Sequence, residues 1–153
     1  MPLEVSATPA GSTVSLEQFD LQGPGIPIVA FAEGWQEPEY NPDMGRPWRW
    51  MSERSVLWIR PVGRDVVLTL TGESPLRYYK DAPRVQVIAG DSDVGAFAPS
   101  SDFTYDITIP ATALSAAQGR VTVKSSRFFV PGGSGGGGDQ RHLAIRMYGV
   151  TVR

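Results

Sequence analysis

The chain has 153 residues, a length typical of one domain with a single buried core. Hydrophobic residues make up 41% and charged residues 20%, and the net charge is -2, so the composition is globular and gives no general attraction to nucleic acid or anionic membrane. The absence of cysteine excludes disulfides, thiolate catalysis and cysteine-ligated zinc. No apolar run reaches membrane-spanning length, so we expect no membrane insertion of this chain.

We expect one domain over residues 1–153, in which residues 1–27 form an N-terminal strand or lead-in. The next segment, residues 33–60, contains all the tryptophans, which are Trp35, Trp48, Trp50 and Trp58. Its first part is acidic and its second part is rich in arginine. Flat apolar faces beside directional hydrogen-bonding groups suit a sugar, and they also suit an anchored sheet core with charged edges.

Residues 35–43 are predicted to form a loop, because Pro38 and Asn41-Pro42 are turn residues. Two interpretations of Trp35 and Tyr40 stay open: they form a binding surface, or they pin the loop over one end of the fold. Glu37 and Glu39 resemble a glycosidase carboxylate pair only weakly, since such pairs usually come from different elements. A solvated or salt-bridged role is favoured for both.

Trp48-Arg49-Trp50 has the alternation of a strand, which puts both tryptophans on one face and Arg49 on the other. The two indoles form either an aromatic platform for a sugar or base, or part of the core. The core is favoured because tryptophan is highly buried on average, and Trp58 is expected there too. Arginine interleaved with tryptophan also suits single-stranded nucleic acid, but the acidic neighbourhood argues against it, so no nucleic acid is expected.

The following segments alternate apolar and polar residues with a period of two, which predicts strands at 66–71, 84–89, 103–109, 121–124 and 143–152. A change of phase at Tyr148-Gly149 predicts a β-bulge. Residues 110–118 predict a helix of about two turns. The residues expected to point inward are Val66, Leu68, Leu70, Phe103, Tyr105, Ile107, Leu143 and Ile145. The predicted fold class is all-β, an antiparallel and jelly-roll-like β-sandwich with at most one short helix.

Residues 131–138 are glycine-rich and are predicted to form a flexible, dispensable loop. The tract contains Gly132-x-Ser134-x-Gly136, the string of a nucleophile elbow, but a helix should follow an elbow and here a strand follows. The same tract matches a dinucleotide fingerprint, which also needs a helix. His142 is the only histidine; it could orient a ligand or act as a base, and a strand-edge residue is the favoured interpretation. No acid–base pair or nucleophile arrangement is present, so we expect no enzyme, no metal and no cofactor.

Several short strings lie along the chain: Gly34-Trp35, Glu37-x-Glu39-Tyr40-Asn41-Pro42, Trp48-Arg49-Trp50-Met51, Ser55-Val56-Leu57-Trp58 and Asp139-Gln140-Arg141-x-Leu143. From Phe31 to the C-terminus, this pattern resembles the extracytoplasmic β-sandwich domain of bacterial multi-spanning glycosyltransferases. Those domains are similar to galactose-binding-like domains and carbohydrate-binding modules. The resemblance implies a glycan ligand, a larger membrane glycosyltransferase or envelope protein as partner, and an extracytoplasmic location. Glycosyl transfer is not carried over, because this chain lacks the transmembrane helices.

Two functions therefore remain open from the sequence. The first is a non-catalytic carbohydrate-binding accessory domain of a bacterial cell-envelope protein. The second is a structural or protein-interaction β-sandwich with no ligand of its own. If there is a glycan site, the predicted ligand-binding residues are Trp35, Glu37, Tyr40, Arg49, Arg141 and His142.

Overall fold

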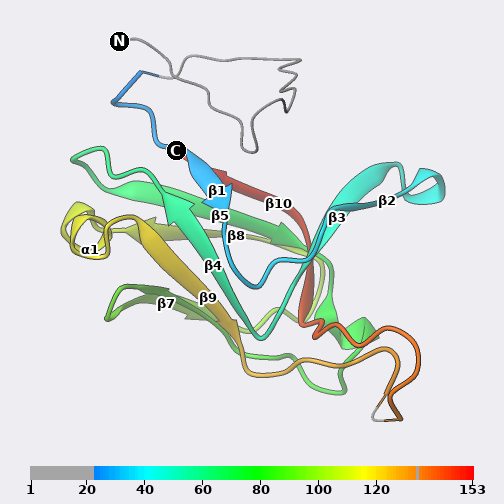
Figure 1. The fold of residues 1–153 in the computed structure, drawn as a ribbon. Helices are drawn as coiled ribbons and strands as arrows, with labels where there is room; N and C mark the ends of the chain where they lie inside the picture. Colours follow the sequence, from blue (N-terminus) through cyan, green and yellow to red (C-terminus); the bar gives the residue numbers. More distant parts are fainter. Residues whose placement is uncertain (1–22, 134) are drawn as a thin grey trace, which may run out of the picture.

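The computed structural model describes residues 23–133 and 135–153 and shows an antiparallel β-sandwich (Figure 1). The expected N-terminal strand within residues 1–27 falls almost entirely outside the described residues. Sheet I has five strands in the order β1-β4-β9-β6-β7, and sheet II has five in the order β2-β3-β10-β5-β8. The strands of sheet I are β1 (Val29–Phe31), β4 (Arg54–Ile59), β9 (Arg120–Ser125), β6 (Val85–Ala89) and β7 (Ser92–Phe97). Those of sheet II are β2 (Glu39–Asn41), β3 (Arg46–Met51), β10 (Ile145–Val152), β5 (Val66–Gly72) and β8 (Phe103–Ile109).

The topology confirms the predicted fold class. Among the described strands, only β2–β3 and β6–β7 are consecutive and pair within one sheet, and the other connections cross between the sheets, as in a jelly-roll-like sandwich. The described helices are short: α1 (Ala111–Ala116), which confirms the predicted helix, and the 3₁₀ turns η1 (Pro42–Met44) and η2 (Pro75–Arg77). The pairing of β10 with β5 shifts register between Met147 and Gly149, which confirms the predicted β-bulge.

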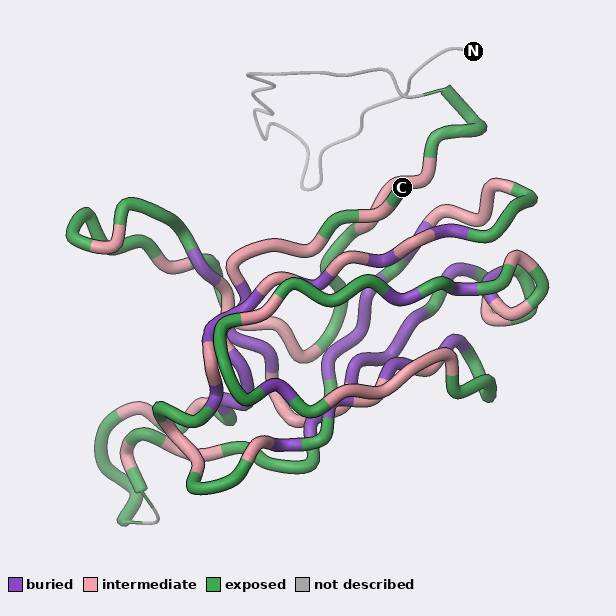
Figure 2. The backbone as a smooth tube through the Cα atoms, turned by 180° about the vertical axis from the view of Figure 1, so that it is seen from behind, coloured by how far each residue is buried: buried purple, intermediate pink, exposed green. Residues whose placement is uncertain are grey.

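The core between the two sheets is largely aliphatic. Its fully buried side chains include Leu57, Ile59, Leu68, Leu70 and Ile109. Figure 2 shows buried positions repeating along the strands of both layers. Burial of apolar area is what stabilises such a core, and strands with a period of two deliver one such side chain every second residue.

Five of the eight residues predicted to point inward are buried between the sheets: Val66, Leu68, Leu70, Ile107 and Ile145. Leu143 is also buried, but in the cluster of Trp48 and Trp50 and not between the sheets. Phe103 is half-buried against the core. The prediction that Tyr105 points into the core is wrong, because this residue is 40% exposed. β8 and β7 are edge strands of the two sheets. Tyr105 therefore lies at the open side of the sandwich, where its ring stacks on Phe97 with centroids 4.3 Å apart.

The prediction that Trp58 belongs to the core is wrong. Leu57 and Ile59 take the inward positions of β4, so strand alternation turns Trp58 to the outer face of sheet I, where 43% of it is exposed. Trp48 and Trp50 are buried as predicted, but not between the sheets. Their neighbour Met51 takes the inward position of β3, and they belong to a separate cluster on the outer face of sheet II.

That cluster, called here the outer cluster, consists of Trp48, Trp50 and Leu143 with Met44, Tyr78, Phe129 and Tyr148 packed against them. Tyr78 comes from the segment after η2 and Phe129 from the segment after β9, so two connections fold over this part of sheet II. The hydroxyl of Tyr79 donates to the carbonyls of Leu143 and Ala144 at 3.1 and 2.9 Å and holds these connections together. Among the residues the structure describes, none forms a helix with the length and apolar character needed to cross a membrane.

Candidate functional site

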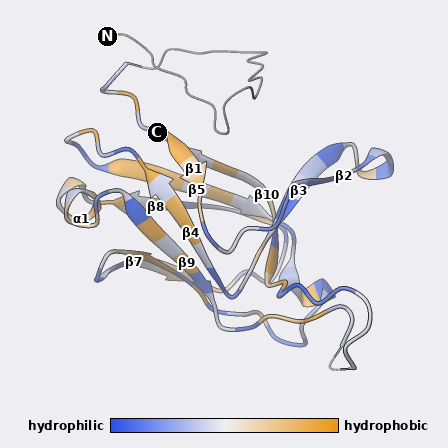
Figure 3. Cartoon of the chain, in the orientation of Figure 1, coloured by the Kyte–Doolittle hydropathy of each residue, from blue (hydrophilic) through white to orange (hydrophobic). Residues whose placement is uncertain are grey.

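The β2–β3 hairpin extends beyond the body of the sandwich (Figure 1) and is among its more hydrophilic parts (Figure 3). Its register pairs Glu39 with Trp48 and Tyr40 with Pro47. Side chains of directly opposed residues point to the same side of a sheet. Glu39 and Trp48 therefore share one face of the hairpin, and Tyr40 and Pro47 share the other.

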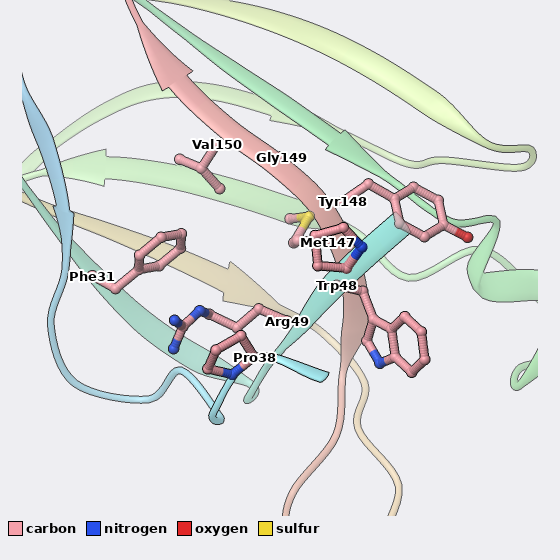
Figure 4. A pocket seen from close by; sticks show the side chains of 9 residues that line it. Phe31, Pro38, Trp48, Arg49, Met147, Tyr148, Gly149 and Val150 are labelled. Atoms are coloured by element: carbon pink, nitrogen blue, oxygen red, sulfur yellow. The ribbon is translucent and has the colours of Figure 1, made fainter. Parts of the chain in front are cut away.

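A groove of about 200 Å³ lies where β1, β3 and β10 come together at the side of the sandwich (Figure 4). It is lined by Phe31, Pro38, Pro47, Trp48, Arg49, Met147, Tyr148, Gly149 and Val150. Phe31, Arg49 and Pro38 lie on one side of β3 in Figure 4, and the side chains of Trp48 and Tyr148 lie on the other. The lining is mostly apolar, and Arg49 supplies its charge.

The guanidinium of Arg49 is fixed in place at this groove. Its guanidinium lies over the Phe31 ring, 4.5 Å from the centroid, and its Nη1 donates to the carbonyl of Gln36 at 2.7 Å. The other guanidinium N–H groups have no hydrogen-bond partner among the described residues. A guanidinium stacked on an aromatic face and fixed by one hydrogen bond loses little further freedom when it binds a ligand.

Trp35 pins the loop rather than presenting a free face. Its Nε1 donates to the carbonyl of Val56 at 2.8 Å, and its ring meets Phe31 edge to face, with centroids 5.0 Å apart. Gly34 makes this approach possible, because it has a φ of +83° and a Cβ there would collide with the Arg54 carbonyl oxygen. Trp35 thus supports the Phe31 side of the groove from beneath.

Tyr40 and Glu37 remain open to solvent. Tyr40 is 63% exposed and lies on the same hairpin face as Pro47, which lines the groove. Glu37 is exposed and makes no hydrogen bond or ion pair with another described residue. Of the two interpretations of this loop, pinning describes Trp35 and an open surface describes Tyr40.

Glu39 and Arg141 are joined on the opposite face of the hairpin. Arg141 forms ion pairs with Glu39 at 2.8 Å and Asp139 at 2.6 Å, and Trp48 Nε1 donates to Glu39 at 3.1 Å. The hydrogen bond from Arg141 holds the pKa of Asp139 below its ordinary value, and its carboxylate partners raise the pKa of Arg141. Glu39 is salt-bridged, as the sequence favoured, and the charge of Arg141 is already compensated.

His142 also has partners within the protein. Its Nδ1 lies 2.9 Å from Glu53 Oε1, and its ring stacks on Phe128 with centroids 4.3 Å apart. Partial burial is the largest single influence and favours a higher pKa for Glu53, but the hydrogen bonds with His142 and the backbone, together with the charge of His142, lower the pKa of Glu53 overall. Neither His142 nor Arg141 lines the groove. Of the predicted site residues, only Arg49 lines the groove. Trp35 packs against its Phe31 wall, and Tyr40 shares a hairpin face with Pro47 without lining the groove.

Sequence reasoning missed Phe31, Pro38 and Pro47 as groove residues. Phe31 precedes the predicted loop and belongs to no motif. Pro38 was interpreted only as a turn residue, and Pro47 was assigned no role. Pairing of Tyr40 with Pro47 was the missing information, because it defines which side chains share a hairpin face. Within residues 23–133 and 135–153, no three histidine, aspartate or glutamate side chains are grouped so as to hold a metal ion.

A buried group of ionisable residues lies under the outer cluster. Glu73 is only 1% exposed, accepts from the Tyr78 hydroxyl at 3.0 Å and pairs with Arg146 at 3.4 Å. Arg146 in turn lies over the rings of Trp48 and Trp50, 4.7 and 5.0 Å from their centroids. Burial, followed by the hydrogen bond to Glu73, raises the pKa of Tyr78 to about 12. Neither Glu73 nor Arg146 lines a described pocket, so we assign this group to structure rather than chemistry.

No family model, curated protein or solved structure matches this chain. Functional inference therefore rests on the residues and the geometry of the described sites.

Proposed function

We propose that the chain is a non-catalytic carbohydrate-binding module, an accessory domain of a bacterial cell-envelope protein, and that a sugar ring occupies the groove beside Phe31 and Arg49. The observation that carries the proposal is that an exposed aromatic ring, Phe31, lies at one groove with the Arg49 guanidinium, most of whose N–H groups have no partner among the described residues. Phe31 is 42% exposed there, and Tyr40 lies at the hairpin face that leads into it.

The physical argument is one of complementary surfaces. The C–H face of a sugar ring packs on an aromatic ring, and its hydroxyls need hydrogen-bond donors and acceptors. Phe31 and Tyr40 provide the rings, and Arg49 provides donors. The groove of about 200 Å³ is smaller than drug-sized pockets, which are on the order of 300–1,000 Å³, so it suits a single ring of a longer glycan.

The cell-envelope setting is supported by the resemblance to extracytoplasmic domains of bacterial glycosyltransferases. Only Lys80 and Lys124 among the 14 basic residues are lysines, a bias that favours a GC-rich bacterial source. In this proposal the module holds a glycan near a larger envelope protein that performs the chemistry.

Glycan arrays and calorimetry test the proposal, with the parent beside Phe31→Ala, Tyr40→Ala and Arg49→Gln. We expect the parent to bind a glycan and each variant to weaken it about tenfold or more, since stacking and charged hydrogen bonds each contribute on the order of 1–3 kcal/mol. Trp58→Ala is the matched control, because Trp58 is as exposed as Phe31 but lies on the outer face of sheet I and does not line the groove. Binding that survives all three groove substitutions would place the glycan elsewhere.

The second candidate, a structural or protein-interaction domain with no ligand of its own, is favoured by a different observation. Trp35, Arg141 and His142 are all engaged by partners within the chain. Charged and aromatic residues that resemble a site would then serve only to fix the hairpin and the loops. This candidate prevails if the parent binds no glycan.

A further inference from the structure

We infer that the outer face of sheet II carries a second binding site, for a neutral polyhydroxylated ring, between Arg46, Tyr148 and Asp102. A hollow of about 250 Å³ lies there. It is lined by Arg46, Thr71, Gly72, Asp102, Phe103, Thr104 and Tyr148. Its walls come from β3, β10, β5, β8 and the segment before β8.

The first wall is an aromatic ring capped by a cation. The β-bulge between Met147 and Gly149 inserts Tyr148 as an extra residue in β10. Bulges re-aim a side chain and are common beside functional sites. The guanidinium of Arg46 lies 3.4 Å above the Tyr148 ring centroid and makes no hydrogen bond or ion pair with another described residue. It keeps its N–H donors for a ligand.

The second wall offers hydroxyls and a carboxylate. Thr71 and Thr104 are directly paired across β5 and β8, and their hydroxyl oxygens lie 3.3 Å apart. Asp102 Oδ1 accepts the backbone N–H of Ser74 at 2.7 Å, which fixes the carboxylate, while its Oδ2 has no described partner. A fixed carboxylate with a free oxygen accepts hydrogen bonds from ligand hydroxyls at little entropic cost.

Polar residues farther along the same face behave differently. Asp106 accepts from Thr69 and Arg153, both at 2.6 Å, and Arg153 also donates to Thr69 at 2.9 Å. The hydrogen-bonding groups of these three residues are paired with one another, as is usual on a solvent-exposed sheet face. Arg46 and Asp102 have unsatisfied capacity at a hollow, and this contrast points to a ligand.

The charges define the class of ligand. One guanidinium and one carboxylate face the hollow, so the charges of its walls offset each other. A neutral ring adds no further charge that would be left without a partner. Vicinal hydroxyls donate to Asp102, other ring oxygens accept from Arg46 and the threonine hydroxyls serve as either. In Figure 4 the Tyr148 side chain points away from Phe31 and Arg49. The site shares the glycan class of the proposed function, and Tyr148 lines both the groove and the hollow. The side chains on which the proposed function depends, Phe31, Tyr40 and Arg49, do not line the hollow, so each site can fail alone.

The test is titration of the isotopically labelled full chain, followed by amide resonances, with lactose, cellobiose and maltose as neutral probes and glucuronate and glucosamine as charged ones. We expect at least one neutral probe in the millimolar range to shift the amides of Asp102, Thr71 and Thr104. Asp102→Asn should weaken this response about tenfold, since it keeps the acceptor for Ser74 but loses the charge. Asp106→Asn, on the same face, is the matched control, and Tyr40→Ala should leave the response intact.

Three results would overturn the inference. They are the absence of any shift at these amides with every probe, stronger binding of a charged probe than of all neutral ones, and an unchanged response in Asp102→Asn. A response confined to Phe31 and Arg49 would support the proposed function while removing the second site.

Discussion

The inter-sheet core and the outer cluster stabilise the same sandwich by different means. The core is a continuous set of aliphatic side chains from both sheets, whose packing is nearly non-directional. The outer cluster packs large aromatic rings around a buried carboxylate and a guanidinium, so its stability depends on specific geometry. Trp50 meets Tyr78 and Phe129 edge to face, with centroids 5.2 and 5.7 Å apart, while Tyr78 and Phe129 stack on each other.

The two regions also differ in what they position. The aliphatic core holds two sheets together, whereas the outer cluster holds the connections that follow η2 and β9 onto sheet II. It lies beside the groove, which Trp48 and Tyr148 line, and beside the second hollow, which Tyr148 also lines. A core of aliphatic residues tolerates exchanges of similar volume, but a half-satisfied polar cluster does not. Damage to the outer cluster should therefore disturb binding surfaces as well as stability.

The largest expected effect comes from breaking the buried ion pair on one side. Glu73→Leu leaves Arg146 without its carboxylate and Tyr78 without its acceptor, and we expect it to cost about 3–5 kcal/mol. Arg146 Nε is already buried without a hydrogen-bond partner in the described structure, so losing the Glu73 carboxylate leaves this guanidinium still less satisfied. Denaturant unfolding measures the loss.

Combining Glu73→Leu with Arg146→Met sharpens this test. Replacing both members of a buried pair by apolar groups is often neutral or stabilising, so the double variant should recover most of the lost stability. Arg77→Met is the control, because Arg77 also pairs with Glu73, at 3.3 Å, but is exposed. A double variant as unstable as the sum of its parts would show that the charges themselves are required.

Leu68→Ala probes the inter-sheet core and should cost about 2–5 kcal/mol through lost burial and the cavity left behind. Leu68 is fully buried in β5, while its neighbour Val67 is half-buried on the opposite face. Val67→Ala should therefore cost clearly less in the same unfolding assay. Unlike Glu73→Leu, the core variant should leave the environment of Trp50 unchanged in near-ultraviolet dichroism. Equal unfolding midpoints for Leu68→Ala and the parent would contradict the assigned facing of β5.

The sequence predicted the aliphatic core far better than the outer cluster. Alternation in residues 66–71 and 103–109 identifies which residues share a face, and this is local information. It does not identify a sheet whose outer face is covered by connections, so Trp48 and Trp50 appeared to belong between the sheets. The pairing of Glu73 with Arg146 spans 73 residues of chain, and no local pattern indicates it. Likewise, Arg49 and Tyr40 were found from residue type, but Phe31 was not, because its role depends on how β1 and β3 meet.

Raising the pH should weaken the outer cluster before the core. The pKa of Tyr78 is 10.0 in its ordinary state and about 12 in the fold, owing to burial and the Glu73 hydrogen bond. Since the folded pKa is the higher one, the contribution of neutral Tyr78 is complete below pH 10 and is lost as pH rises through about 12. In urea unfolding, Tyr78→Phe should therefore lose less stability than the parent as the pH rises. Part of the loss should remain, because burial raises the pKa of Tyr79 too. An alkaline loss of stability as steep in Tyr78→Phe as in the parent would contradict this prediction.

The smallest effects concern the glycine-rich loop, whose ends the outer cluster anchors. Phe129 and Leu143 form an isolated β-bridge, in which each backbone N–H donates to the other residue's carbonyl with an N···O distance of 2.9 Å. The backbone N–H of Gly132 donates to the Asp139 carbonyl at 2.7 Å. A Cβ at Gly132 would meet the Gly137 carbonyl and lie 2.6 Å from Gln140 Nε2, whereas nothing lies within 4 Å of a Cβ at Gly137.

We therefore expect Gly132→Ala to cost about 1 kcal/mol by crowding the base of the loop. Gly137→Ala should be neutral within about 0.5 kcal/mol, as surface substitutions usually are. Deleting residues 135–137 should also change the free energy of unfolding by less than about 1 kcal/mol, because the cost of closing a loop varies slowly with its length. Urea unfolding of the three variants checks these values. The tract predicted to be dispensable would then be dispensable at its tip and constrained at its base. A Gly132→Ala variant as stable as Gly137→Ala would instead show that the backbone at the base of the loop can shift to accommodate a Cβ, and that the outer cluster alone positions the loop.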